Sequence, residues 1–188
     1  MTTLHTPVGP SDHAQGPDDA PVTLVEYGDY QCPYCAQAHP IVKQIQARLG
    51  DQLRFVFRNF PLTQIHREAL PAAVAAESVG KVAGPNTFWA MHDLIFEHQR
   101  DSAHALRAPY LLAYAEEAGA DPEHVARYLD APELTARVRE DFIGGVRSGV
   151  NGTPTFFING ERFDGDWRDI EAFTAALYQA ATEARVPA

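Results

Sequence analysis

The only two cysteines of the chain stand two residues apart, in the segment Cys32-Pro33-Tyr34-Cys35. An apolar run from Val22 to Val25 precedes this segment, and apolar residues at helical spacing follow it, so the pair falls where a strand leads into a helix. Free backbone N–H groups and the positive end of a helix dipole favour a thiolate at that position. The sequence therefore predicts a strand, a helix and a reactive thiol pair between them.

A structural role for this pair explains the sequence less well. A Cys32–Cys35 disulfide would close a loop of two residues, and the stabilisation from a disulfide grows with the length of its loop. Together with His39 the two cysteines would offer three metal ligands, whereas a structural zinc site uses four. We therefore expect a redox pair and no bound metal, with His39 an ordinary helix residue.

Composition limits the partners. The 188 residues carry a net charge of −10, and no cluster of Lys and Arg occurs, so neither nucleic acid nor an anionic membrane surface is an expected partner. No apolar stretch approaches the roughly 20 residues that a membrane-spanning helix needs. The first residues, Met1 to Pro7, have neither the basic nor the apolar region of a secretory signal, which predicts a cytoplasmic protein.

The first part of the chain has a strand–helix–strand pattern. Residues 1–20 lack periodicity and are expected to form an irregular arm, and a strand is expected over 22–27. A helix ending at Gly50 is predicted by the spacing of Ala38, Ile41, Val42, Ile45 and Leu49. A second strand is expected over 53–58, parallel to the first because a helix connects them.

The rest of the chain is first helical and then returns to strands. Residues 66–148 contain no strand-like pattern, and Asp121-Pro122-Glu123 predicts a helix start inside this region. A hairpin is expected around Asn159-Gly160, followed by a helix that opens at Asp166-Trp167. The chain thus divides into an arm at 1–20, a first half at 21–62, a helical insertion at 63–148 and a second half at 149–188.

This order, βαβ, helical block and ββα, resembles an α/β thioredoxin fold with an all-helical insertion between its two halves. More narrowly, the chain resembles the DsbA-like thiol oxidoreductases. The resemblance covers roughly residues 8–183, and three segments carry it: Glu26 to Cys35, the aromatic block Phe88 to Phe96, and Gly149 to Ile158.

The resemblance implies a role for several residues. Cys32 would be the attacking cysteine and Cys35 the resolving one, and Pro154 matches the family's cis-proline, with Thr153 before it. Glu26 matches a buried acid beneath the active site. Alternatives remain for the last two, because Glu26 could be an edge residue that faces water and Pro154 a trans turn proline.

Pro33 and Tyr34 lie between the cysteines. Pro33 favours helix initiation, and Tyr34 offers a flat surface for substrate or for tuning the thiolate. We expect His66, His92 and the pair Phe88-Trp89 to form or cap the helical core and to have no chemical role.

The expected activity is thiol:disulfide exchange with protein or small-molecule thiols, through a mixed disulfide on Cys32 and with a redox recycling partner. No bound cofactor is expected, but Pro33-Tyr34 is the dipeptide of glutaredoxins, which makes glutathione a candidate co-substrate. It also favours an intermediate potential, with reduction or isomerisation preferred over net oxidation. The alternatives are a glutathione-linked reductase or transferase, a non-catalytic chaperone or adaptor, and a glutathione-transferase-like isomerase.

Overall fold

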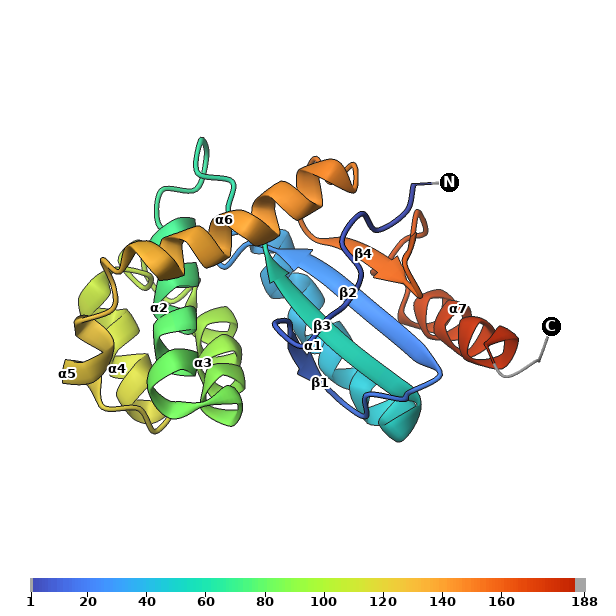
Figure 1. The fold of residues 1–188 in the computed structure, drawn as a ribbon, viewed down its shortest axis with the longest axis horizontal. Helices are drawn as coiled ribbons and strands as arrows, with labels where there is room; N and C mark the ends of the chain where they lie inside the picture. Colours follow the sequence, from blue (N-terminus) through green and yellow to red (C-terminus); the bar gives the residue numbers. More distant parts are fainter. Residues whose placement is uncertain (1, 185–188) are drawn as a thin grey trace.

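A five-stranded sheet with helices on both faces forms one half of the molecule, and a helical block forms the other (Figure 1). The computed structural model describes residues 2–184. The sheet has the strand order β1-β3-β2-β4-β5. Its strands are β1 (His13–Gln15), β2 (Val22–Gly28), β3 (Leu53–Asn59), β4 (Thr155–Ile158) and β5 (Glu161–Arg162). The helices are α1 (Pro33–Leu49), α2 (Ala69–Ala83), α3 (Pro85–His98), α4 (Ala108–Glu117), α5 (Pro122–Ala126), α6 (Pro132–Arg147) and α7 (Ile170–Glu183), with a 3-10 turn at Gly50–Gln52.

The first half of the sheet is the predicted βαβ unit. β2 and β3 pair in parallel, with Val22 opposite Leu53 and Gly28 opposite Asn59. α1 connects them, beginning at Pro33, where a missing N–H costs nothing, and ending before Gly50, whose φ of 53° suits glycine. The parallel arrangement expected from the helical connection is therefore confirmed.

The second half completes the sheet. β4 pairs antiparallel with β2, and the turn residues Asn159 (φ 48°) and Gly160 (φ 84°) connect it to β5. Both turn residues have the positive φ that a two-residue hairpin requires, which is why Asn-Gly predicts the hairpin correctly. With α7 after β5, the order βαβ, helical block and ββα is confirmed.

The helical block comprises α2 to α5, and α6 runs from it to the sheet (Figure 1). α5 begins as predicted, with the Asp121 carboxylate accepting the N–H of Glu123 at 2.9 Å and that of His124 at 3.4 Å. The apolar face of α6 is only partly buried, because Val138 is enclosed while Val146 is 53% exposed. None of the helices within residues 2–184 is long and apolar enough to cross a membrane.

Two expectations about local structure were wrong. The arm at 1–20 is not irregular throughout, because His13–Gln15 pairs with the edge of β3 as β1. The last helix does not open at Asp166-Trp167 but at Ile170. The Asp166 carboxylate caps a local turn through the N–H of Arg168 (3.0 Å), and Asp169 instead caps α7 through the N–H of Ala172 (3.0 Å).

Alternate residues of the central strand β2 face opposite sides of the sheet. Leu24 packs in the cluster that holds α1, α3 and α7, whereas Val25 and Tyr27 pack in a smaller cluster with the N-terminal arm and Phe142 of α6. Because side chains alternate along a strand, Glu26 faces the same side as Leu24. That side is the one covered by α1, on which the cysteines lie.

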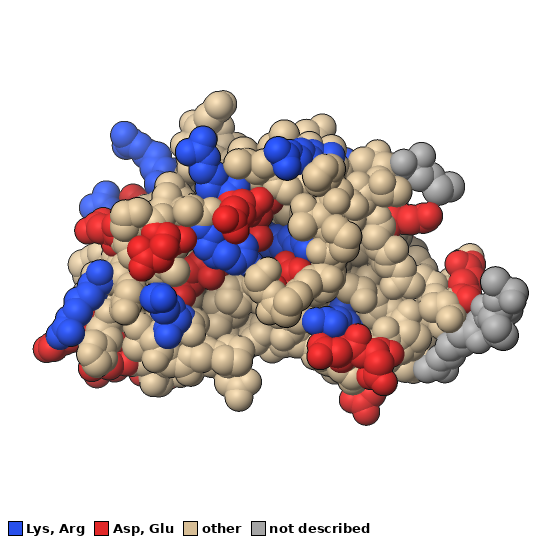
Figure 2. Space-filling view, viewed as in Figure 1, with Lys and Arg blue, Asp and Glu red and all other residues tan. Residues whose placement is uncertain are grey.

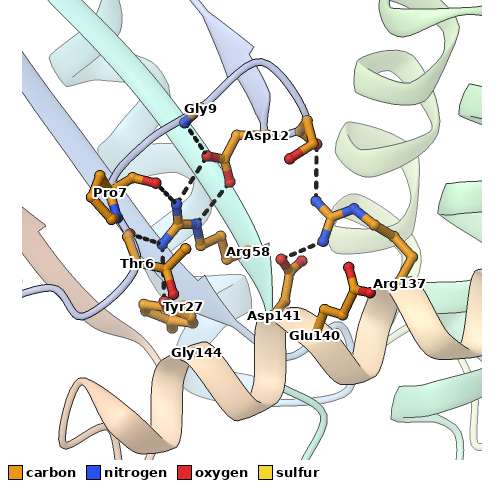
Figure 3. A pocket seen from close by; sticks show the side chains of 11 residues that line it. Thr6, Pro7, Gly9, Asp12, Tyr27, Arg58, Arg137, Glu140, Asp141 and Gly144 are labelled. Atoms are coloured by element: carbon orange, nitrogen blue, oxygen red, sulfur yellow. Dashed lines mark hydrogen bonds and ion pairs between the residues drawn. The ribbon is translucent and has the colours of Figure 1, made fainter.

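Arg58 of β3 anchors the arm on the other face (Figure 3). Its guanidinium donates to both carboxylate oxygens of Asp12 (2.7 and 2.9 Å), to the carbonyls of Thr6 and Pro7, and to the Tyr27 hydroxyl. These five contacts use all five N–H groups, so Arg58 has none left for a ligand in the adjoining cavity of about 110 Å³. Its role is to clamp the arm to the sheet.

Candidate active site

The two cysteines occupy the start of α1. Cys32 is the N-cap residue, with extended φ and ψ of −71° and 122°, and Pro33 is the first helical residue. Both thiols are free, with Cys32 3% and Cys35 0% exposed, whereas the Tyr34 side chain between them is 51% exposed. The end of β2 and the first turn of α1 therefore position the pair as the sequence spacing indicated.

The environment of Cys32 favours its thiolate. A hydrogen bond from the Cys35 thiol is the largest cause that lowers the Cys32 pKa, to about 5. The Thr153 side chain and the N–H groups of Cys35 and Tyr34 act in the same direction, while burial opposes them. Of the two cysteines, Cys32 is therefore the one whose thiolate is favoured, and the thiolate is the reactive form of a cysteine.

Cys35 has the opposite character. Burial raises the pKa of its thiol well above the ordinary value, and the hydrogen bond to Cys32 and the charge on Glu26 raise it further. Only the backbone N–H of Asp29, which donates to Cys35 Sγ at 3.4 Å, lowers it. The pair thus favours one sulfur as thiolate and the other as thiol.

Glu26 lies on the helix-covered face of β2 and is 3% exposed, so it is not an edge residue that faces water. Burial, and then the charge on Cys32, raise its pKa from 4.5 to about 8. Its Oε1 atom is buried without a hydrogen-bond partner. Glycine at position 28 leaves room for the Phe57 ring and the Glu26 carboxyl, since a β-carbon there would lie 2.4 Å from the Phe57 ring and 3.2 Å from Glu26 Oε1. A carboxyl with a pKa near neutrality can take up or release a proton at this site.

The loop before β4 closes the other side of the pair. The Thr153–Pro154 peptide bond is cis, and Cys32 Sγ lies 3.4 Å from the Thr153 carbonyl oxygen. Thr153, 121 positions from Cys32 in sequence, and its neighbour Pro154 are held there because β4 pairs with β2. The structure thus brings together all seven site residues that the sequence singled out.

Arg168 was missed from the sequence. Its guanidinium carbon lies 5.4 Å from the centroid of the Tyr34 ring and 4.3 Å from that of Trp167. Such stacking holds a planar cation against aromatic faces. Tyr34 is therefore held at the rim of the site by a residue whose only sequence signal was its place beside a tryptophan.

Asp29 was also missed, although it follows directly after β2. Its carboxylate is buried and accepts hydrogen bonds from the N–H groups of Gln31 (2.7 Å) and Leu62 (2.8 Å). The same carboxylate lies 2.8 Å from His66 Nδ1, so His66 caps the active-site loop rather than the helical core. A charged residue between an apolar strand and the cysteines was the available signal.

A group of possible metal ligands lies outside the cysteine pair. One donor atom each of His39, His92 and Asp93 lies within 4.8 Å of the others. However, Lys43 Nζ is 2.8 Å from Asp93, and the Tyr30 hydroxyl is 3.0 Å from His92 Nδ1. The lysine already neutralises the one carboxylate, so we interpret the group as a buried polar contact between α1 and α3.

Comparison with known proteins agrees with this geometry. A family model described as thioredoxin matches residues 9–178. Oxidised BdbD from Bacillus subtilis is similar with a TM-score of 0.80 and 28% identity, over 91% of this chain and 93% of that one. A thioredoxin-like oxidoreductase from Silicibacter pomeroyi has a TM-score of 0.73 and 27% identity, over 96% and 95% of the two chains. DsbA1 from Wolbachia pipientis shares the fold, with a TM-score of 0.80 and 18% identity over 95% and 94%.

Higher sequence identity is found in much longer proteins. Over 184 residues, which make up 97% of this chain, it is 43% identical to a Na⁺/H⁺ antiporter NhaA from Salinispora arenicola. It spans only 27% of the antiporter's length. The match over residues 9–178, the fold and the buried cysteine pair agree with one another. The chain belongs to the thioredoxin family, and its fold is that of the DsbA-like members.

Proposed function

We propose that this protein exchanges a Cys32–Cys35 disulfide or dithiol with protein or small-molecule thiols by a dithiol mechanism. The observation that carries the proposal is the division between the two sulfurs, one with a pKa of about 5 and the other with a pKa raised by burial. In the reducing direction, the Cys32 thiolate attacks a substrate disulfide, and the first substrate sulfur leaves as a thiolate. Cys35 then gives up its proton and attacks Cys32, which forms the Cys32–Cys35 bond and releases the second substrate sulfur.

Glu26 supports this cycle as the proton acceptor for Cys35. The Cys35 thiol is buried, so water has little access to its proton, and the charge on Glu26 contributes to the raised Cys35 pKa. A group with a pKa of about 8 is well matched to exchange protons near neutral pH.

Substrate would bind beside Cys32, on the backbone around Thr153 and Pro154. Cys32 Sγ lies 3.4 Å from the Thr153 carbonyl oxygen, so an extended peptide that reaches this sulfur lies beside the backbone of Thr153 and Pro154. Tyr34, half exposed and stacked on Arg168, offers a flat surface at the same rim.

The expected redox potential follows from the Cys32 pKa. A stabilised thiolate favours the dithiol form, by about 30 mV for each pKa unit below the ambient pH. The value of about 5 lies between those of the thioredoxin (about 7) and DsbA (about 3.5) cysteines, whose couples lie near −270 and −120 mV. We adjust the thioredoxin and DsbA potentials for the difference between their cysteine pKa values and that of Cys32. This gives about −160 to −220 mV, an intermediate potential that suits isomerisation or reduction.

The partners we propose are thiols and disulfides, together with a redox partner that recycles the pair and no bound cofactor. On the face in Figure 2, acidic and basic side chains are interspersed over the helical block. This distribution and the net charge of −10 support neither nucleic acid nor an anionic membrane as a partner.

A cytoplasmic location fits a chain whose only cysteines are the reactive pair. Cell fractionation tests this, and recovery with membranes would contradict it.

Equilibration with glutathione buffers, followed by acid trapping of free thiols, tests the proposal directly. We expect one two-electron couple between about −160 and −220 mV and turnover of protein disulfides such as those of insulin. A couple above about −150 mV would overturn the proposed direction.

Glutathione itself is the second candidate substrate, favoured by the Pro33-Tyr34 dipeptide. Turnover that strictly requires glutathione would favour a glutathione-linked reductase or transferase. Holdase activity that survives replacement of both cysteines would favour a chaperone or adaptor, and defeat the dithiol proposal.

A further inference from the structure

The backbone of Asp29 contacts both cysteines. Its N–H donates to Cys35 Sγ at 3.4 Å, and its carbonyl accepts the N–H of Cys32 at 3.0 Å. The residue lies between the end of β2 and α1, outside both elements. Its backbone geometry is therefore set by whatever holds its side chain.

The Asp29 side chain is fixed by three donors from two segments. Oδ1 accepts the N–H of Gln31 at 2.7 Å, and Oδ2 accepts the N–H of Leu62 at 2.8 Å. His66 Nδ1 lies 2.8 Å from the same Oδ2, and the Asp29 side chain is 0% exposed. A buried carboxylate with three donors cannot rotate without leaving polar groups unpaired. The loop after β3 thus holds Asp29, and with it the N–H aimed at Cys35.

We propose that Asp29 is a positioning residue for the resolving step, in which Cys35 attacks the mixed disulfide. The inference rests on the proposed dithiol mechanism. In that step the Cys35 S–H bond breaks, the Cys32–Cys35 bond forms and the Cys32–substrate bond breaks, so the substrate sulfur leaves as a thiolate. Negative charge develops on Cys35 Sγ before attack, and the Asp29 N–H is a donor already directed at it.

The effect should fall mainly on one sulfur. The Cys32 thiolate is stabilised by the Cys35 thiol, the Thr153 side chain and the N–H groups of Cys35 and Tyr34. None of these groups is hydrogen-bonded to the Asp29 carboxylate, which accepts from Gln31, Leu62 and His66. Loss of that carboxylate should therefore slow the second step much more than the first.

A stopped-flow experiment with dithiobis-nitrobenzoate separates the two steps. Attack by Cys32 on this aromatic disulfide releases one coloured thiolate, at a rate proportional to reagent concentration. Attack by Cys35 releases a second, at a rate independent of it. For Asp29→Asn, we expect the first rate to change less than about twofold and the second to fall about tenfold, the effect of weakening one hydrogen bond to a thiolate.

The chain offers a matched control. His13 Nε2 lies 2.9 Å from Glu77, with exposed side-chain fractions of 18% and 6%, against 17% and 0% for the His66–Asp29 pair. Glu77→Gln removes a similarly buried carboxylate bonded to histidine, away from the cysteines. Glu77→Gln should lower the free energy of unfolding measured in urea, as Asp29→Asn does, but leave both release rates unchanged. His66→Phe, which removes a single contact to Asp29, should show a smaller slowing of the second release and serves if Asp29→Asn does not fold.

The outcomes distinguish the two proposals. Equal slowing of both releases in Asp29→Asn, or an unchanged second release in folded Asp29→Asn or His66→Phe, would overturn the positioning role. A wild-type protein that releases only one thiolate, or a Cys35→Ser variant that still releases the second one intramolecularly, would instead overturn the dithiol mechanism.

Discussion

Replacing Glu26 by Gln should make the protein more stable, by an amount that depends on pH. The carboxyl has a pKa of about 8 in the folded protein, against an ordinary value of 4.5. Above pH 4.5 the unfolded chain gives up this proton while the folded protein retains it, so wild-type stability falls as pH rises. Each pH unit costs about 1.4 kcal/mol until the folded carboxyl itself ionises near pH 8.

The expected gain in stability follows from the interval between the two pKa values of the Glu26 carboxyl, 4.5 and about 8. Gln cannot titrate, so Glu26→Gln should match wild type near pH 4 and exceed its free energy of unfolding by about 3 kcal/mol at pH 7. Above pH 8 the difference should level off at about 5 kcal/mol. The protonated Glu26 carboxyl and the Gln amide have nearly the same shape, and Glu26 Oε1 has no hydrogen-bond partner that the substitution would remove.

Urea unfolding of the reduced proteins across this pH range is the assay. The depressed Cys32 pKa acts in the opposite direction, stabilising the folded protein as pH rises, but it is present in both proteins and largely cancels in their difference. Glu97→Gln, at an exposed position of α3, is the control for replacing a carboxylate by an amide. A constant gap between Glu26→Gln and wild type from pH 4 to 9 would refute the reasoning about burial.

Three further predictions concern the cysteines and the arm. Cys32→Ser should abolish disulfide reduction, whereas Cys35→Ser should accumulate mixed disulfides visible by mass spectrometry; equal partial activity in both would contradict the assigned roles. Thiolate absorbance of the reduced protein should titrate with a midpoint of about 5, and Cys35→Ala should move it toward the ordinary 9.0, because the Cys35 hydrogen bond is the largest cause of the shift. Arg58→Met should cost about 3–5 kcal/mol in urea unfolding, since it leaves the Asp12 carboxylate buried without its cation; a loss under about 1 kcal/mol would show that the clamp contributes little.

Local pattern was enough for most of the fold. The strand and helix around the cysteines, the Asp121 cap and the Asn159-Gly160 hairpin each depend on residues close together in sequence, whose backbone preferences act locally. β1 could not be found this way. Its three residues have no strand pattern of their own and are extended because the edge of β3 supplies their hydrogen bonds.

The start of α7 shows a related limit. Asp166 and Asp169 can both cap a helix, and both do accept a nearby backbone N–H. In the structure Asp169 begins the helix, and Phe173 and Leu177 of α7 are buried. Local chemistry offered two possible caps, and the pattern along the chain does not choose between them.

The reactive pair was determined by the sequence itself, because two cysteines at this spacing before a helix have few other uses. Their chemical difference was decided by the tertiary structure. Burial of Cys35 and Glu26, the approach of Thr153 across 121 residues, and the hold of the β3–α2 loop on Asp29 all depend on strand pairing and packing between distant segments. A pKa reports the solvation and neighbours of a group in space, and spacing along the chain does not encode these.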